Sequence, residues 1–374
     1  MRKLIYAALI AASTIVLIQA CSKSTDGSKP VDNGSSFDRK GMLTNISTNI
    51  IIPAYTAYQA NVVSLDAAVT AFNAGPTTTN LTALQAAFKL AYQQWQATSV
   101  FDLGPAEQVS LRVNTNTYPT DVAQINANIT AGAYEPTLLA NLAAKGLPAL
   151  DYLLFGTGSD NNAILLQYTT DSKAANRKAY LSKLSAELKA NATTVLSAWT
   201  SSYKTTFINA GGTDQGSSTG LLINQLVYDY ETLKNYEIGI PAGVQSMGTT
   251  FPQKVQAYYS KMSVQLALLH LKAIQNIYLG VGATGDGLGL DDYLVQAKAK
   301  YSDGTSLNDV IKAQFATATT KLNGLTDPLS DNIKNNLTAV TATYTELQKL
   351  TVLLKTDLPS SLGILITYGD NDGD

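Results

Sequence analysis

The chain has 374 residues, a formal net charge of −2 and only 14% charged side chains. Without residues 1–20, which carry two basic side chains and no acidic one, 354 residues remain, with 24 basic and 28 acidic side chains. No basic stripe is visible in the sequence, and only Arg39, Arg112 and Arg177 remain for bidentate phosphate contacts. We therefore expect no nucleic-acid partner. The length exceeds what one hydrophobic core usually supports, which predicts one large or two medium domains.

The N-terminus has the pattern of a bacterial lipoprotein signal. Two basic residues precede an apolar run over residues 4–18, which is too short for a good membrane-spanning helix. Cys21, the only cysteine of the chain, follows Ile-Gln-Ala as in a relaxed lipobox. We therefore predict a signal peptide over residues 1–20 and lipidation of Cys21, the alternative being an ordinary signal peptide with a stray thiol. Residues 21–36, rich in Ser, Gly, Asp and Lys, are expected to form a flexible tether between the membrane-anchoring lipid and the folded domain.

Apolar residues recur at steps of three and four along most of the chain, which indicates amphipathic helices and an all-α fold. One such stripe runs from Leu81 to Trp95, and another from Tyr180 to Tyr203. Helices are predicted near residues 38–73, 79–98, 121–131, 147–154, 173–206, 221–237, 253–278, 307–323 and 331–356. Turn-rich segments at 209–220 and 280–289 interrupt the pattern. The first of these is the better domain boundary, which predicts an N-terminal bundle over 37–210 and a C-terminal bundle over 211–374.

An eleven-residue stretch, Gly-Leu-Pro-Ala-Leu-Asp-Tyr-Leu-Leu-Phe-Gly at residues 146–156, carries the most specific signal. It resembles the signature segment of the imelysin-like family, usually written Gly-x-His-x-x-Glu, with Pro148 at the His position and Asp151 at the Glu position. Proline can neither bind a metal nor move a proton. Residues 102–105, 118–121, 235–241, 258–280 and 355–374 also resemble family segments, in the family's order, so the resemblance covers roughly residues 40–370.

The resemblance implies two helical bundles that arose by duplication and pack around an interdomain cleft holding the site. It also implies the family's activities, which are peptidase activity in some members and iron uptake in others. The cleft residues that it suggests for ligand binding are Asp102, Gly104, Asp121, Gly146, Pro148, Asp151 and Glu237. Asp151 and Glu237 are the carboxylates that it offers to iron or another divalent metal.

Each of these residues has a structural interpretation beside the functional one. Pro148 and Asp151 can simply start a buried helix, with proline fixing φ and the carboxylate near the positive end of the helix dipole. Glu107 is interpreted as a residue in the first turn of a helix that starts after Gly104, rather than as a catalytic acid. His270, the only histidine, lies in an apolar helical segment and is interpreted as a hydrogen-bonded core or interface residue rather than a catalytic base.

Several familiar sites are excluded or disfavoured by the residue inventory. One histidine rules out a zinc centre with two or three His ligands, and no Gly-x-Ser-x-Gly motif is present. The Gly-x-Gly-x-x-Gly match at residues 280–285 follows a helix rather than a strand, so it is no dinucleotide site. Residues 370–374 open like a calcium loop, but no twelfth-position Glu follows, and an acidic tail is the simpler interpretation.

We therefore expect an outer-membrane lipoprotein that faces the periplasm or the cell surface and is more a binding protein than an enzyme. It would hold iron, another metal or a small ligand in the cleft and hand it to envelope uptake proteins. The alternatives are a metal-dependent peptidase that works without the signature His, and a surface scaffold with a vestigial cleft.

Overall fold

A computed structural model of the chain describes residues 37–368, and these residues belong to one compact unit. The predicted signal peptide, Cys21 and the calcium-like tail lie outside the described residues. Within them the structure is built from helices and turns, with two isolated bridges at Gly282–Gly285 and Lys300–Ser306. The all-α prediction is confirmed. No helix in this part of the chain has the length and apolar character needed to cross a membrane.

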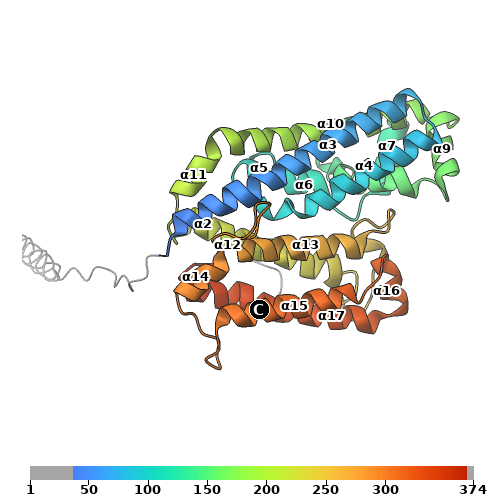
Figure 1. The fold of residues 1–374 in the computed structure, drawn as a ribbon. Coiled ribbons are helices and arrows are strands. Elements are labelled where there is room, and N and C mark those ends of the chain that lie inside the picture. Colours follow the sequence, from blue (N-terminus) through green and yellow to red (C-terminus); the bar gives the residue numbers. More distant parts are fainter. Residues whose placement is uncertain (1–36, 369–374) are drawn as a thin grey trace, which may run out of the picture. The chain divides into compact units, whose positions relative to one another are not determined.

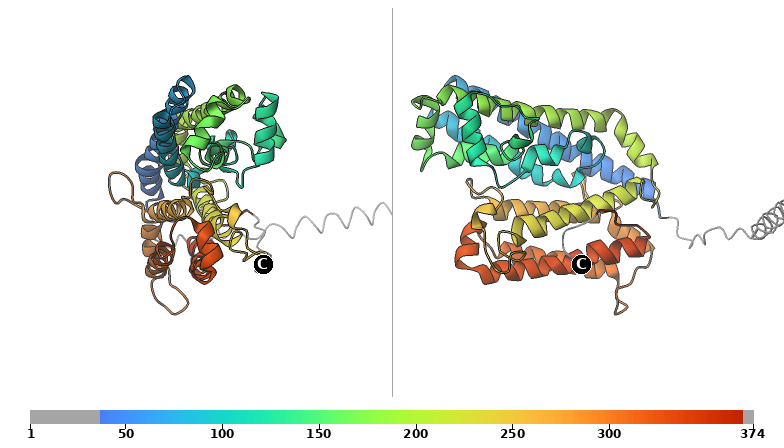
Figure 2. Two further views of the ribbon diagram at one scale, coloured as in Figure 1. Left: turned by 90° about the vertical axis from the view of Figure 1, so that its right-hand side faces the viewer. Right: turned by 180° about the vertical axis from the view of Figure 1, so that it is seen from behind.

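The first half of the described chain forms one bundle, drawn blue to green in Figures 1 and 2. Its long helices, α3, α4 and α10, pack side by side. The helical segments are α2 (Arg39–Asn45), η1 (Ile46–Ile51), α3 (Ile52–Ala74), α4 (Thr78–Gln96), η2 (Ser99–Phe101), α5 (Pro105–Gln108), α6 (Leu111–Asn116), α7 (Val122–Ala131), η3 (Leu139–Asn141), α8 (Gly146–Asp151), η4 (Tyr152–Gly156), α9 (Asn161–Thr169), α10 (Ala174–Ala198), η5 (Trp199–Tyr203) and α11 (Lys204–Asn209).

The second half forms the other bundle, drawn yellow to red. In it α13 packs on α15, and α15 on α17. Its segments are α12 (Ser218–Glu231), η6 (Thr232–Gly239), η7 (Pro252–Lys254), α13 (Ser263–Leu279), α14 (Leu290–Gln296), α15 (Leu307–Asn323), α16 (Leu329–Asn335), α17 (Leu337–Val352), η8 (Leu353–Asp357) and α18 (Leu358–Leu362). The bundles meet where α13 packs on α4 and α12 packs on η2.

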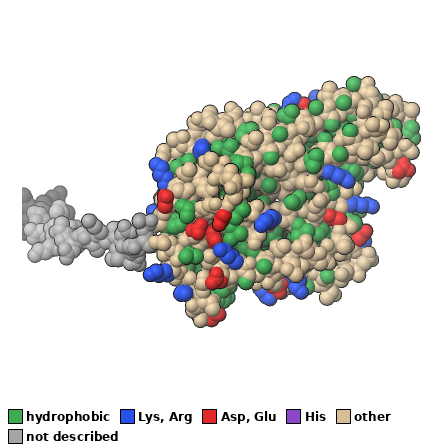
Figure 3. All heavy atoms as spheres, viewed as in Figure 1, with side chains coloured by type: hydrophobic (Ala, Val, Ile, Leu, Met, Phe, Trp, Pro, Cys, Tyr) green, Lys and Arg blue, Asp and Glu red, His purple; other side chains and the backbone are tan. Residues whose placement is uncertain are grey.

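The apolar stripes found in the sequence form the cores. Leu81, Leu84, Phe88, Ala91, Tyr92 and Trp95 are all buried on α4, as their spacing on one helical face predicts. On the face shown in Figure 3, charged side chains lie singly or in small mixed groups among uncharged ones. The predicted boundary at residues 210 and 211 falls in the loop between α11 and α12 and remains a prediction.

The helix predicted over residues 253–278 is wrong in its first ten residues, where the short segment η7 ends at Lys254 and a turn-rich loop follows, and only α13 is a regular helix. Ala257 and Lys261 have φ of +51° and +60° there, in the left-handed region that breaks a helix. Carboxylates from distant segments bind this loop and the start of α13: Asp151 accepts from two loop N–H groups, and Asp327 accepts from the backbone of Val264 and Gln265. These tertiary bonds replace the intrahelical ones that periodicity led us to expect.

Smaller differences have local causes. The helix predicted over residues 331–356 is interrupted at Asn336, whose φ of −147° is not helical, and asparagine is a residue that favours helix ends. Pro148 is the third residue of α8 rather than the first, since the helix begins at Gly146. The short helices α6, α9, α14 and α18 were not predicted, because their few turns carry too little periodicity to detect.

Candidate functional site

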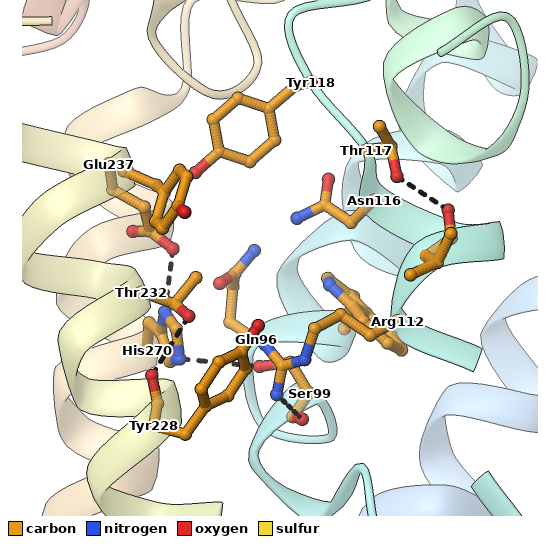
Figure 4. A pocket seen from close by; sticks show the side chains of 13 residues that line it. Gln96, Ser99, Arg112, Asn116, Thr117, Tyr118, Tyr228, Thr232, Glu237 and His270 are labelled. Atoms are coloured by element: carbon orange, nitrogen blue, oxygen red, sulfur yellow. Dashed lines mark hydrogen bonds and ion pairs between the residues drawn. The ribbon is translucent and has the colours of Figure 1, made fainter. Parts of the chain in front are cut away.

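A cavity of about 240 Å³ lies where the two bundles meet. One wall comes from the first bundle, through the end of α4, η2, α6 and the loop after it. The other wall comes from the second bundle, through α12, η6 and α13 (Figure 4). The lining residues are Trp95, Gln96, Ser99, Arg112, Val113, Asn116, Thr117, Tyr118, Tyr228, Thr232, Tyr236, Glu237 and His270.

His270 sits between two carboxylates in this wall. Its Nδ1 lies 2.8 Å from Glu237 Oε1 and its Nε2 lies 2.5 Å from Asp229 Oδ2, and all three side chains are buried. With an acceptor at each ring nitrogen, both nitrogens act as donors, which requires the protonated ring. Burial by itself lowers the pKa of His270, but the charges of Asp229 and Glu237 outweigh it and raise the pKa to about 10. His270 is therefore an imidazolium at neutral pH.

Arg112 completes a charge network across the two bundles. Its Nη2 lies 2.5 Å from Asp229 Oδ1 and donates to the carbonyl of Ser99, and its Nε lies 3.3 Å from Asp102 Oδ2. Burial raises the pKa of Asp229, yet Arg112 and His270 hold the pKa below its ordinary value. In Asp102 burial wins over Arg112, and the pKa is raised. Asp229 thus stays ionised and joins a cation from each bundle.

Local winding of the helix places Asp229 and Glu237 on the same side of it. The two residues are eight positions apart, which in an ideal α-helix is roughly 2.2 turns and leaves the side chains well out of line. The segment from Thr232 to Gly239 is π-helical and continuous with α12. Its wider i→i+5 turns reduce the offset, so that both carboxylates reach the single imidazole.

Three buried polar atoms in the lining have no hydrogen-bond partner among the described residues: Gln96 Nε2, Tyr118 Oη and Glu237 Oε2. Ser99 Oγ lies 3.5 Å from His270 Nε2, at the limit of a hydrogen bond. Because a buried polar group without a partner is costly, such atoms indicate where a ligand would bind.

The signature segment lies beside a second, smaller cavity of about 150 Å³, lined in part by Tyr118, Pro148 and Asp151. Asp151 is buried, and its two oxygens each accept a backbone N–H at 2.9 Å, from Tyr259 and from Ser260. Burial raises the pKa of Asp151 to about 6, against the lowering effect of these hydrogen bonds. In this chain Asp151 holds the 253–262 loop in place.

Other residues suggested by the resemblance have clear structural tasks. Asp121 caps α7 through Gln124 N at 2.9 Å. Gly104 has φ +56° and lies against the ring of Tyr203, and Glu107 accepts from its N–H at 3.0 Å, as the helix-start interpretation of Glu107 predicts. Gly146 has φ +69°, and a Cβ there would lie 2.3 Å from the carbonyl oxygen of Thr115.

Of the residues predicted to bind a ligand, only Glu237 lines the main cavity. Asp102 does not line it but contacts Arg112, which does. Pro148 and Asp151 line the smaller cavity. His270 is buried and hydrogen-bonded, as interpreted from sequence. Its partners Asp229 and Arg112 were missed, because an isolated Asp and Arg in helical segments carry no motif. The one feature of the sequence that could have indicated this network was the scarcity of His and Arg.

No group of three or more His, Cys, Asp or Glu side chains in the described part of the chain could hold a metal ion. Both Asp151 oxygens and one Glu237 oxygen are already hydrogen-bonded. The residues present therefore do not fit a directly coordinated iron ion, which prefers several free oxygen or nitrogen ligands. The pairing of Asp151 and Glu237 as metal ligands remains a prediction without a third partner.

Comparison with known proteins identifies the family. The family model of imelysin (Peptidase_M75) matches residues 51–355. The chain belongs to the imelysin family. A curated relative, iron-regulated protein A of Synechococcus elongatus, is 23% identical over 288 residues, which cover 76% of this chain and 75% of that protein.

Two solved structures share the imelysin fold of this chain. A putative iron-regulated protein A precursor from Parabacteroides distasonis aligns with a TM-score of 0.72 and 16% identity, covering 90% of this chain and 97% of that one. An imelysin-like protein from Psychrobacter arcticum aligns with a TM-score of 0.66 and 21% identity, covering 88% and 97%. The predicted family is confirmed.

Proposed function

We propose that this imelysin-family protein is a non-catalytic binding protein of the cell envelope, whose cavity between the bundles takes a small organic ligand. The observation that carries the proposal is the cavity wall, in which a fixed charge network lies beside buried polar atoms without partners. A preorganised cavity with a few convergent polar groups is the usual form of a small-molecule site.

The state of His270 argues against catalysis. A general base must be unprotonated at the working pH, whereas His270 keeps its proton up to a pKa of about 10. Ser99 lies near Nε2, but that nitrogen directs its proton to Asp229 at 2.5 Å. The imidazolium therefore cannot accept the Ser99 proton, and the Ser–His–carboxylate arrangement lacks an activated nucleophile.

We place the binding step in iron supply rather than in direct coordination of iron. The names of the Synechococcus and Parabacteroides relatives both describe an iron-regulated protein, while the cavity of this chain offers no set of free metal ligands. An organic ligand handled by an envelope uptake system accounts for both facts. The lipobox at Cys21 supports anchoring to the outer membrane, facing the periplasm or the cell surface.

The test is a thermal-shift screen of metabolites and chelators on three proteins: the wild type, Thr232→Phe and Thr341→Phe. Thr232 lines the cavity and is half-buried, so phenylalanine fills it. Thr341 is equally half-buried, bonds a carbonyl four residues back like Thr232, and lies on α17 outside the lining. A true ligand raises the melting temperature of the wild type and of Thr341→Phe, but not of Thr232→Phe.

A ligand that stabilises Thr232→Phe as much as the wild type binds elsewhere and refutes the site. Casein cleavage by the purified wild type would refute the non-catalytic role, and loss of that cleavage with a chelator would establish the metallopeptidase alternative. A near-stoichiometric metal in elemental analysis would overturn the organic ligand.

A further inference from the structure

Glu237 lines the cavity and has one carboxylate oxygen without a hydrogen-bond donor. The side chain is 4% exposed, Oε1 lies 2.8 Å from the His270 ring, and Oε2 has no donor among the described residues. A buried carboxylate oxygen without a donor loses its hydration and gains nothing in return. A ligand that brings an N–H to this atom would restore the missing bond, most strongly if the N–H carries positive charge.

The other lining side chains suit an organic cation. Four aromatic residues line the cavity: Trp95, Tyr118, Tyr228 and Tyr236. The rings of Tyr118 and Tyr228 can be seen in Figure 4, and aromatic faces attract cations through the ring quadrupole. Tyr228 already holds one, since the Arg112 guanidinium carbon lies 5.4 Å from its ring centroid. Tyr118 Oη, which also lacks a partner, can accept a further N–H.

The charges of the network leave an excess of one carboxylate. Arg112 and His270 are cations, while Asp102, Asp229 and Glu237 are acids. Asp229 contacts both cations, Asp102 contacts only Arg112, and Glu237 shares His270 with Asp229. Asp102 and Glu237 each keep one buried oxygen without a hydrogen-bond partner, and of these two carboxylates only Glu237 lines the cavity. One bound monocation would neutralise the site.

Resting on the proposed binding function, we propose that the ligand is a small organic ammonium ion. Its N–H binds Glu237 Oε2, and its hydrocarbon part packs against Trp95 and the tyrosine rings. Gln96 Nε2, the remaining unpartnered donor, binds an oxygen of ligands that carry one.

The experiment is isothermal titration calorimetry on the full protein with three probes of the same shape: cyclohexylmethylammonium, cyclohexylmethanol and cyclohexanecarboxylate. At pH 7 they differ mainly in the charge of the head group. We expect the ammonium probe to bind about tenfold or more tighter than the alcohol, the gain of a charge-assisted hydrogen bond, and the carboxylate to bind weakest.

Glu237→Gln should remove the preference for the ammonium probe, since it keeps the shape and deletes the charge. Glu231→Gln is the matched control: Glu231 is 5% exposed, bonds Lys355 and lies outside the lining, so the preference should persist. If Glu237→Gln fails to fold, Tyr118→Phe keeps the ring, removes the unpartnered hydroxyl and should weaken the ammonium probe several-fold.

The possible results distinguish failure of the ammonium assignment from failure of the proposed binding function. If the alcohol or the carboxylate binds as tightly as the ammonium, the cavity binds ligands but the charge assignment is overturned. The charge assignment is likewise overturned if none of the probes binds and the metabolite screen finds an uncharged or anionic ligand that stabilises the wild type but not Thr232→Phe. If neither probes nor screen yields a ligand, both proposals fail.

Discussion

The charge of His270 should make the stability of the protein fall steadily with rising pH. The pKa of His270 is about 10 in the folded protein, against about 6.5 in an unfolded chain. Between these values the unfolded state releases a proton that the folded state keeps, so folding loses stability as pH rises. The slope approaches about 1.4 kcal/mol per pH unit, and raising the pH from 6.5 to 8.5 should cost roughly 2 kcal/mol.

Because His270 is the only histidine, the assay is direct. The imidazole resonances in NMR should report one ring that stays protonated through pH 8.5, and urea unfolding at pH 6.5 and 8.5 should give the free-energy difference. His270→Gln should abolish the pH dependence over this range. A ring that titrates with a midpoint below about 8, or a wild-type stability that is flat or rises over the same range, would refute the charged-imidazole reasoning.

Three further perturbations test other parts of the structure. Gly146→Ala should destabilise the protein by about 1–3 kcal/mol, because it combines positive φ with a clash against the Thr115 carbonyl, while Gly75→Ala, whose nearest contact is at 3.8 Å, should be nearly neutral in urea unfolding. Asp151→Ala should leave the helical circular dichroism spectrum unchanged but speed hydrogen exchange at the amides of Tyr259 and Ser260, which lose their acceptor. Unchanged exchange would contradict the conclusion that Asp151 holds the 253–262 loop in place. Cys21→Ala should move the protein from the membrane fraction to the soluble fraction, and retention at the membrane would exclude the lipid as its main anchor.

The sequence by itself determined the helical class and most of the core. The stripe from Leu81 to Trp95 could be placed correctly because burial on one face of a helix leaves a periodic record in the chain. The signature segment likewise identified the family, and the substitution of Pro148 for histidine already argued against the usual chemistry. The helix start at Glu107 could be predicted as well, since capping is local, whereas Asp121, expected as a ligand-binding residue, caps α7.

Only the tertiary structure decided the site. Asp229 and His270 come from two helices of the second bundle, and Arg112 of the first bundle reaches them because the two bundles pack together, a relation that no local pattern encodes. The π-helical winding after α12 turns Glu237 toward His270, whereas a regular 3.6-residue period would direct it elsewhere. The apolar pattern of residues 253–262 predicts a helix. These residues form a loop instead, because the carboxylate of Asp151, which is distant in the sequence, binds their backbone. Periodicity records which residues are buried, and packing decides which of them touch.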